Sequence, residues 1–442
     1  MPATAPNELL RAALTETRWT YEAAVRAVNN VAAERGQRIR TSPASLHQWL
    51  SGVSPRPATV VYLAEAFSRR LRRRVEPADL GYHVTTTPID KVREPLASLT
   101  DLGRDDVDRR NLLTSAIYSL GALALPFSDV RPRAAHAART GRQVGAADVD
   151  TVMAIARQFD SIDERYGGGT GREAVTAFLA NDVAAFCAAA SGRIRQDMFA
   201  AAVELAFLAG WKNHDLQREG TAQRYYLHAH DLACELADPS LRGHVMRILA
   251  HQALDLGHST GSCLDLAETS TRLVAGRVDP HTEAVFTLTI ARAHALAGDR
   301  HRTLEAINTA ERLDARASEG DTRPDWPKMR NNRGQFYSHV AKSLVDIGDL
   351  AGAEHHFTLA WQERDPRTHT LISGLSQAWL AECQIKRGNI GAACANWAGA
   401  QQMLRGVSSQ RASQCWRDMR ALLHPYTGRR IPEVDALLRS PA

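Results

Sequence analysis

One spacing of small and bulky residues recurs five times between residues 210 and 400, and it constrains the fold more than any other feature of this chain. Each copy begins with a small residue, which is followed seven residues later by a turn position. A second small residue comes after the turn, then a bulky residue four positions later, and a third small residue three positions after that. Antiparallel helices approach closely only where side chains are small, and glycine supplies the left-handed backbone that ends a helix. The spacing predicts an all-α body of about five stacked helix pairs, an α-solenoid. The expected turns lie at Gln217, Gly257, Gly298, Gly348 and Gly388.

The five copies differ in quality. The last two, GDLAGAEHHFTLA (residues 348–360) and GNIGAACANWAGA (residues 388–400), resemble tetratricopeptide repeats. The second copy is degenerate and has Ser262, Leu266 and Thr269 at its small, bulky and small positions. Successive turns are 40, 41, 50 and 40 residues apart, and the ten extra residues fall in a predicted loop, ASEGDTRPDWPKMRNN. We expect a solenoid over residues 194–442, preceded by an irregular helical connector over residues 88–193 that RYGGGTGREA interrupts.

The excess positive charge is confined to the first fifth of the chain. Residues 1–87 contain 12 arginines, no lysine and 7 acidic residues, which gives a net charge of +5. The remaining residues contain 42 basic and 42 acidic side chains, so their net charge is zero. A small basic unit on a neutral body is typical of an anion-binding domain joined to a domain of another kind. The charge therefore predicts a separate N-terminal domain over residues 1–87.

Four amphipathic helices are expected in this domain, over about residues 7–17, 20–34, 41–52 and 58–72. The third, TSPASLHQWLSG, opens on capping hydroxyls and a proline and ends at a glycine. Its Leu46, Trp49 and Leu50 form an apolar face, and the other residues are short, uncharged and able to form hydrogen bonds. This order of elements resembles the helix-turn-helix of the phage-repressor-like (XRE) family. The matching residues are Thr20, Ala23, Ala24, Leu46, Trp49, Gly52 and Pro55.

The resemblance implies that the third helix enters the major groove of double-stranded DNA, where short donors and acceptors suit base edges. We expect base contacts from Thr41, Ser42, Ser45, His47 and Gln48. Phosphate contacts, which position a protein without specifying sequence, are expected from Arg38, Arg40, Arg56 and the run Arg69, Arg70, Arg72, Arg73 and Arg74. About ten extra residues separate the second and third helices, which departs from the family's tight turn and leaves the angle of approach open.

The resemblance extends to the whole organisation of the chain. The segments DDVDRRNLL, FDSIDERYGGG, LAFLAGWKNHD and AQRYYLHAHDLA, combined with this head and these repeats, resemble actinobacterial regulators that pair an XRE-type helix-turn-helix with a tetratricopeptide body. The resemblance implies a transcriptional regulator. Because one head buries little surface on DNA, a homodimer on two adjacent half-sites is expected. A tetratricopeptide scaffold or adaptor whose head binds protein is the alternative.

The first helix of each pair should line the concave surface of the superhelix. Near the small packing residues this surface is expected to be mainly basic and hydrogen-bonding, which suits a peptide carboxylate or an acidic segment of a protein effector. The alternative is that these residues form a solvated face or bond within the array. They are Trp211, His214, Arg247, His251, Arg292 and Lys342.

The sequence shows no sign of catalysis or of a cofactor. The glycine-rich residues 167–175 lack the Lys-Ser/Thr pair of a phosphate-binding loop, and no HExxH motif occurs. We therefore predict no enzyme activity, no cofactor and no metal site. No stretch approaches the roughly 18 apolar residues of a membrane helix, and no apolar segment of a secretory signal opens the chain. A cytoplasmic protein without a membrane partner is expected.

Overall fold

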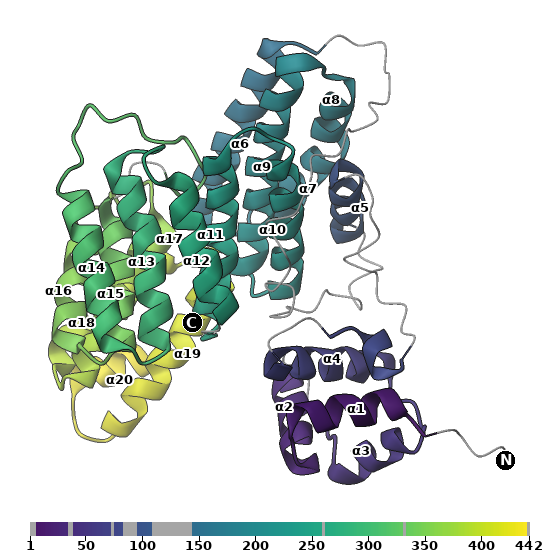
Figure 1. Ribbon diagram of the computed structural model, residues 1–442. Coiled ribbons are helices and arrows are strands. Elements are labelled where there is room, and N and C mark those ends of the chain that lie inside the picture. Colours follow the sequence, from purple (N-terminus) through teal and green to yellow (C-terminus); the bar gives the residue numbers. More distant parts are fainter. Residues whose placement is uncertain are drawn as a thin grey trace. The chain divides into compact units, whose positions relative to one another are not determined.

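The structure is a computed structural model, and it describes residues 6–33, 39–71, 75–82, 95–107, 144–258, 261–329 and 333–439. Within these ranges the chain is all-α and contains no strand, as the sequence predicted (Figure 1). The described residues fall into two compact units, a head (residues 6–82) and a body (residues 95–107 and 144–439). The predicted boundary at residue 87 lies in the gap between the described parts of the two units. In the described ranges, no helix combines the length and apolarity that a membrane crossing requires.

Four helices and a short 3-10 turn enclose the core of the head. Leu10, Val28, Leu46 and Leu63, one from each helix, are at most 1% exposed. Burying a side chain of this size favours folding by about 1.5–3 kcal/mol, so the head has its own hydrophobic core. The four predicted helices are confirmed to within two residues at their ends. The elements are α1 (Glu8–Thr17), α2 (Tyr21–Ala33), α3 (Pro43–Leu50), α4 (Pro57–Leu71) and η1 (Pro77–Leu80).

Side-chain caps explain where these helices begin. The Asn7 side chain accepts a hydrogen bond from an amide of the first turn of α1 at 2.9 Å, and the Thr20 hydroxyl accepts one at the start of α2 at 3.2 Å. At α3, the hydroxyls of Ser42 and Ser45 each accept a hydrogen bond from the other residue's amide at 3.3 Å. This reciprocal capping box, followed by Pro43 in the first turn, confirms the predicted start of the third helix.

The body contains the five predicted helix pairs, stacked one on the next (Figure 1). All five expected turn residues adopt the left-handed conformation, with φ between 56° and 84°, and at Gln217 a non-glycine residue does so. The predicted positions of the turns are therefore confirmed. The pairs are α9 (Gly192–Asp215) with α10 (Glu219–Cys234), α11 (Pro239–Asp255) with α12 (Gly261–Val274), α13 (Pro280–Leu296) with α14 (Arg300–Asp314), α15 (Arg333–Asp346) with α16 (Leu350–Gln362), and α17 (Thr370–Lys386) with α18 (Ile390–Leu404).

The small residues act as expected at four of the five pairs. In the first pair, the Tyr226 ring lies against Gly210 in the space that a Cβ atom would need. The degenerate second pair differs from the prediction: Leu266 is buried, but the small residues facing α11 are Cys263 and Ser270. Each lies one position beyond the residue chosen from the sequence. At Gly243 of α11, an added Cβ atom would lie 3.0 Å from the Ser270 carbonyl oxygen, so α12 approaches α11 closely at this point.

Helices outside the repeats belong to the same compact unit. The described parts of the predicted connector pack on the repeats: α5 lies against α10, and α6 lies against both α9 and α17. Helix α6 therefore bridges the first and the fifth pair. These elements are α5 (Pro95–Val107), α6 (Ala146–Tyr166), α7 (Arg172–Phe178), the π-helical turn η4 (Leu179–Val183) and α8 (Ala184–Ala189). The C-terminal elements are α19 (Gln410–Leu423), η5 (His424–Tyr426) and α20 (Pro432–Arg439).

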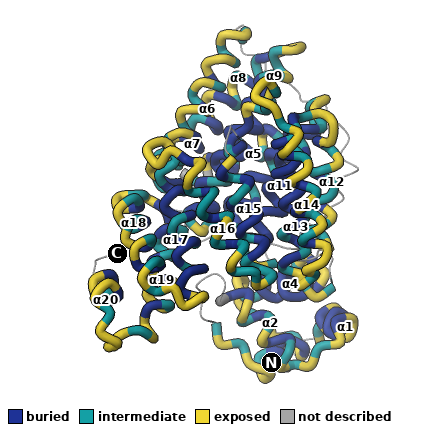
Figure 2. Tube along the Cα trace, turned by 90° about the vertical axis from the view of Figure 1, so that its left-hand side faces the viewer, coloured by how far each residue is buried: buried dark blue, intermediate teal, exposed yellow. Residues whose placement is uncertain are grey.

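The first helices of the pairs are buried around most of their circumference. In α11, every residue from 243 to 254 is buried, and in α13 only a few positions are not. Figure 2 shows α11 and α15 mainly in the colour of buried residues, whereas α12 and α14 carry many exposed ones. A helix buried on all sides has packing partners on every face. The surface predicted as an open concave groove is therefore largely covered by the chain itself.

The glycine run of the predicted connector closes this arrangement. The Gly169 amide donates to the Ser408 carbonyl at 2.9 Å, and the Ser408 amide donates to the Tyr166 carbonyl at 2.8 Å. The Gly168 amide donates to a carboxylate oxygen of Asp215, at the end of α9, at 2.8 Å. A Cβ atom on Gly168 would lie 2.7 Å from the Asp215 Cβ, so only glycine permits this approach. The run joins the two ends of the solenoid.

We expect Gly168→Ala to destabilise the body by about 2 kcal/mol, because the added methyl group overpacks a site bounded by the backbone and Cβ of α9. Urea unfolding of the full chain followed by circular dichroism measures this. Gly391→Ala, in α18 with no atom near the new methyl group, is the matched control and should stabilise the body slightly, by up to about 1 kcal/mol. Equal stability of the two variants would show that the glycine run does not close the body.

Candidate functional site

Helix α3 is fixed in the head by bonds at both ends. The Asn29 side chain, on α2, donates to the Thr41 carbonyl at 3.0 Å and accepts from the Thr41 amide at 3.1 Å. At the other end, the Asn7 amide donates to the Leu50 carbonyl at 3.0 Å. Leu46 and Trp49 anchor the apolar face in the core. A short helix held in this way presents its outer face in one orientation, which a recognition surface requires.

The structure places the predicted base-reading residues unequally. His47 and Gln48 are exposed on the outer face of α3. Ser42 and Ser45 lie at the start of the same face, but their hydroxyls already form the capping box. Thr41 is half-buried, and its backbone is held by Asn29, a residue that the sequence analysis did not identify. His47 and Gln48 are therefore the best placed of the five to contact a ligand.

The predicted phosphate-binding arginines divide into three groups. Arg40 and Arg56 are exposed, just before α3 and α4. Arg69 and Arg70 make contacts inside the head: the Arg69 guanidinium pairs with Glu65 at 2.9 Å, and that of Arg70 donates to the Thr17 carbonyl at 3.1 Å, at the end of α1. These two arginines stabilise the fold. The others, Arg38, Arg72, Arg73 and Arg74, lie outside the described residues.

The ends of these helices add to the positive charge. Helices α1 and α2 carry Glu8 and Glu22 in their first turns, which offset the partial positive charge of a helix N-terminus. Helices α3 and α4 have no acidic residue in the first turn, and an arginine precedes each. The two uncompensated N-termini favour an anion nearby.

A second site lies inside the body, where the six predicted effector residues come together around a carboxylate that the sequence analysis missed. Asp255, at the end of α11, forms ion pairs with Arg292 and, at 3.4 Å, with Lys342. The His214 ring nitrogen lies 3.4 Å from the same carboxylate, and Asp346 pairs with Arg292 at 3.4 Å. Burial alone would raise the pKa of Asp255, but the surrounding cations hold it well below its usual range.

Two of the basic side chains beside Asp255, His214 and Lys342, titrate differently. Burial opposes the charged form of His214, but Glu219 at 2.8 Å and Asp255 outweigh this effect and raise its pKa to about 9. Burial of Lys342 dominates over its attraction to Asp255 and lowers its pKa to about 8. Near neutral pH both are charged. Because His214, Arg292 and Lys342 already have carboxylate partners, these three cations are not free for an acidic ligand.

The remaining predicted residues complete the cluster. Arg247 is 2% exposed, donates to the His339 ring at 3.0 Å and lies 5.5 Å from the centre of the Phe286 ring. His251 packs edge-on against His339 at 5.2 Å, and burial lowers the pKa of both rings well below the usual value. Trp211 lies beside His251, with ring centres 6.2 Å apart. The structure thus brings all six predicted residues into one buried region.

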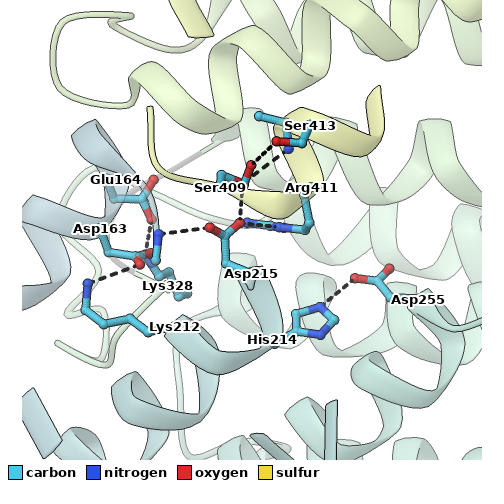
Figure 3. Close-up of polar contacts among 12 residues, drawn as sticks. Asp163, Glu164, Lys212, His214, Asp215, Asp255, Lys328, Ser409, Arg411 and Ser413 are labelled. Atoms are coloured by element: carbon cyan, nitrogen blue, oxygen red, sulfur yellow. Dashed lines mark hydrogen bonds and ion pairs between the residues drawn. The ribbon is translucent and has the colours of Figure 1, made fainter. Parts of the chain in front are cut away.

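A neighbouring polar cluster joins the repeats to α6 and α19, and sequence reasoning missed it. Lys212, which is fully buried, pairs with Asp163 of α6 at 3.3 Å and donates to the Thr170 carbonyl at 3.0 Å. Lys328, from the loop before α15, also pairs with Asp163, at 2.5 Å (Figure 3). Burial would raise the pKa of Asp163, but the two lysines reverse this and hold it below its usual value. Asp215 links this cluster to Ser409 at 2.8 Å and Arg411 at 2.7 Å (Figure 3).

One sequence signal could have indicated these residues. Lys212 and Asp215 interrupt a long apolar helix, and ionisable side chains are rarely buried unless they are paired. The pattern indicates a buried ion pair but does not name the partners, because Asp163 and Arg411 lie 49 and 196 residues away.

Two patterns of enzyme chemistry can be compared with the described residues. In those ranges, no group of three or more His, Cys, Asp or Glu side chains is arranged to hold a metal ion. The sequence GHSTG at residues 257–261 has the spacing of a hydrolase nucleophile elbow, which requires a strand before its serine. Here helix α11 precedes it, and the serine itself lies outside the described residues.

The head matches a known family model, and the body does not contribute to the match. Residues 10–83 match the model described as the SP15 N-terminal domain. The matched range contains α2, α3, α4 and η1, together with most of α1. No curated protein matches the chain. The head is therefore similar to a recurring domain whose limits agree with the compact unit seen in the structure.

We expect His214→Gln to reduce the free energy of unfolding more at low pH than at high pH. The pKa of His214 is raised from 6.5 in the unfolded chain to about 9 when folded, so its contribution is complete below pH 6.5 and lost as pH rises through 9. The difference between wild type and variant should fall by about 3 kcal/mol between pH 6 and pH 10. Urea unfolding at the two pH values measures it. His355→Gln removes an exposed imidazole and is the control; a pH-independent loss in His214→Gln would contradict the ion pairs described.

Proposed function

We propose that the chain is a sequence-specific DNA-binding transcriptional regulator, in which the head reads DNA through α3 and the body binds an effector. The observation that carries the proposal is the combination, on α3 and α4, of acid-free N-termini, a preceding arginine at each, and exposed hydrogen-bonding side chains. Helix N-termini and arginines suit phosphates, and the side chains of His47 and Gln48 suit base edges. The resemblance to XRE-type helix-turn-helix proteins supports the same role.

The geometry of α3 supports base reading by a few residues. An α-helix with its side chains is about 10–12 Å in diameter, which fits the major groove of about 12 Å width. Because the hydroxyls of Ser42 and Ser45 cap the helix, base contacts would come chiefly from His47 and Gln48. One head makes few such contacts, so we propose that a homodimer binds two half-sites in the cytoplasm.

The effector role of the body rests on its buried charges. Replacing a buried ion pair by apolar residues is often neutral or stabilising, so ionic interiors are a weak device for stability alone. Ionisable groups with shifted pKa values also gather where proteins bind ligands. The cluster around Asp255 and the cluster around Asp163 have both properties. A scaffold whose head binds protein remains the alternative, and retention of a protein partner without DNA binding would favour it.

We expect His47→Ala with Gln48→Ala to weaken binding to a preferred duplex by about tenfold or more, because each lost base contact removes about 1–3 kcal/mol of discrimination. The preferred duplex is first selected by the full chain from a random pool, and binding is then measured by fluorescence anisotropy on that duplex and on a scrambled one. Affinity for the scrambled duplex should change little. Thr15→Ala, an exposed change on α1, is the control. Failure of the wild-type chain to enrich any sequence at physiological salt would overturn the proposed function.

Arg40→Ala and Arg56→Ala should act differently, by lowering affinity for both duplexes to a similar extent. Each phosphate contact contributes about 0.9 to the slope of log affinity against log salt concentration, so each variant should reduce that slope by about 1. Arg11→Ala removes the same charge from an exposed arginine of α1 that pairs with Glu8, and it should leave the slope nearly unchanged. An equal reduction in all three variants would indicate a general effect of net charge and not defined phosphate contacts.

A further inference from the structure

One connection between successive helix pairs is much longer than the other three. The chain joins α14 to α15 through residues 315–332, whereas 4 to 7 residues join each of the other successive pairs. Connections between helices of a bundle usually have 2–8 residues, and longer ones are often functional. We call its described residues 318–329 the strap. They contain most of the insertion that the sequence analysis placed before the fourth repeat.

The strap places an ammonium group in an acidic pocket on α6. Nζ of Lys328 lies 3.1 Å from Asp160, 2.5 Å from Asp163 and 2.6 Å from Glu164. The same atom lies 5.6 Å from the centre of the Trp211 ring. Carboxylates combined with an aromatic face form a strong site for a cation. Figure 3 shows Lys328 between α6 and the end of α9.

The strap also places an aromatic ring among the first helices of the repeats. Trp326 is 8% exposed and stacks on His244 of α11, with ring centres 4.9 Å apart and planes 17° apart. On α13 its neighbour is Phe286, at 6.5 Å. The strap thus fills two adjoining positions in the interior of the superhelix, one for an aromatic side chain and one for a cation two residues further along.

Side chains hold the strap more than its backbone does. Its backbone hydrogen bonds among the described residues, from Asp321 to Ser318 and from Met329 to Trp326, close turns within the strap itself. Lys328 has a left-handed backbone, with φ of 61°, which costs a non-glycine residue about 1–2 kcal/mol. Asp325 also pairs with Arg157 at 2.8 Å, and Arg323 pairs with Asp279 at 3.7 Å. A segment that is held to the body by side chains, and strained at one of them, resembles a bound peptide more than an integral part of the repeats.

The acidic pocket requires a cation whether or not the strap is present. Asp160, Asp163 and Glu164 face two ammonium groups, those of Lys328 and Lys212. Without Lys328, the buried Asp163 would lose one of its two lysine partners, which is strongly unfavourable. Any ligand that displaces the strap must therefore supply a positive charge at this point. The pocket selects against the acidic ligand that the sequence analysis expected.

We infer that the strap is an internal ligand of the body, and that the effector is a peptide segment of a protein partner that displaces it. The segment carries an aromatic residue and, two positions later, a lysine, which occupy the places of Trp326 and Lys328. The inference deepens the effector role proposed above and rests on it, but it does not depend on DNA binding by the head.

The test uses a labelled peptide with the strap's own sequence, DTRPDWPKM (residues 321–329). It is added to the full chain carrying Trp326→Ala and Lys328→Met, whose strap supplies neither the aromatic ring nor the ammonium group. We expect saturable binding that is at least tenfold tighter than to the wild-type chain, where the attached strap competes at a high effective concentration. A peptide with norleucine in place of lysine should bind at least tenfold more weakly. Lys386→Met removes a surface lysine paired with Glu382, and it should behave as wild type.

Absence of binding to the folded double variant, or equal binding of the two peptides, would overturn the inference. If the chain still bound DNA in that case, the proposed role of the head would remain. If the peptide bound as expected but the chain bound no DNA, the inference about the strap would remain. Should the double variant not fold, hydrogen exchange of the wild-type chain decides. Amides of the strap should exchange at least 100-fold faster than those of α15. If the amides of the strap and those of α15 both exchanged only through global unfolding, the strap would be a fixed part of the core.

Discussion

Asp215 is the residue on which the closed form of the body depends. Its buried carboxylate accepts hydrogen bonds from the Gly168 amide, the Ser409 hydroxyl and the Arg411 guanidinium. A buried carboxylate is tolerated only when such donors surround it, and here they come from segments more than 200 residues apart in the chain. The first pair, the glycine run and the C-terminal helix must therefore assemble together. An open solenoid is stabilised by contacts between neighbouring repeats, whereas this body adds contacts between its first and last ones.

Closure explains an otherwise contradictory property of the first helices. Helices α9, α11 and α13 are buried on nearly all sides, yet they carry lysine, arginine, histidine and aspartate. In an open superhelix these side chains would line a solvated groove. In the closed body they meet Asp163 of α6 and Asp255 of α11, and their charges are compensated inside the protein. The interior is ionic because α6 and the strap bring charges of their own to it.

The sequence predicted what is encoded locally and missed what closure adds. Turns at Gly298, Gly348 and Gly388 and the cap at Ser42 follow from short-range rules, and the structure confirms them. In the second pair the predicted register was wrong by one residue, because small side chains occur at adjacent positions and the spacing does not distinguish between them. The six predicted effector residues, among them Trp211 and His214, lie together in the structure because each is close in sequence to a small packing residue of a first helix. Asp163, Lys328 and Arg411 were missed because their partners lie 49 to 196 residues away, and no local spacing encodes such pairs.

A closed body restricts how a ligand can act on it. A ligand that displaces the strap exchanges for a part of the chain that already occupies the interior. The apparent association constant of such a ligand is then its intrinsic association constant multiplied by the fraction of molecules in which the strap is displaced. Because Lys328 contacts α6, and α6 contacts both the first and the fifth pair, the exchange bears on the two ends of the solenoid at once. A local replacement of one side chain can thus change the arrangement of the whole body, which a two-state response requires.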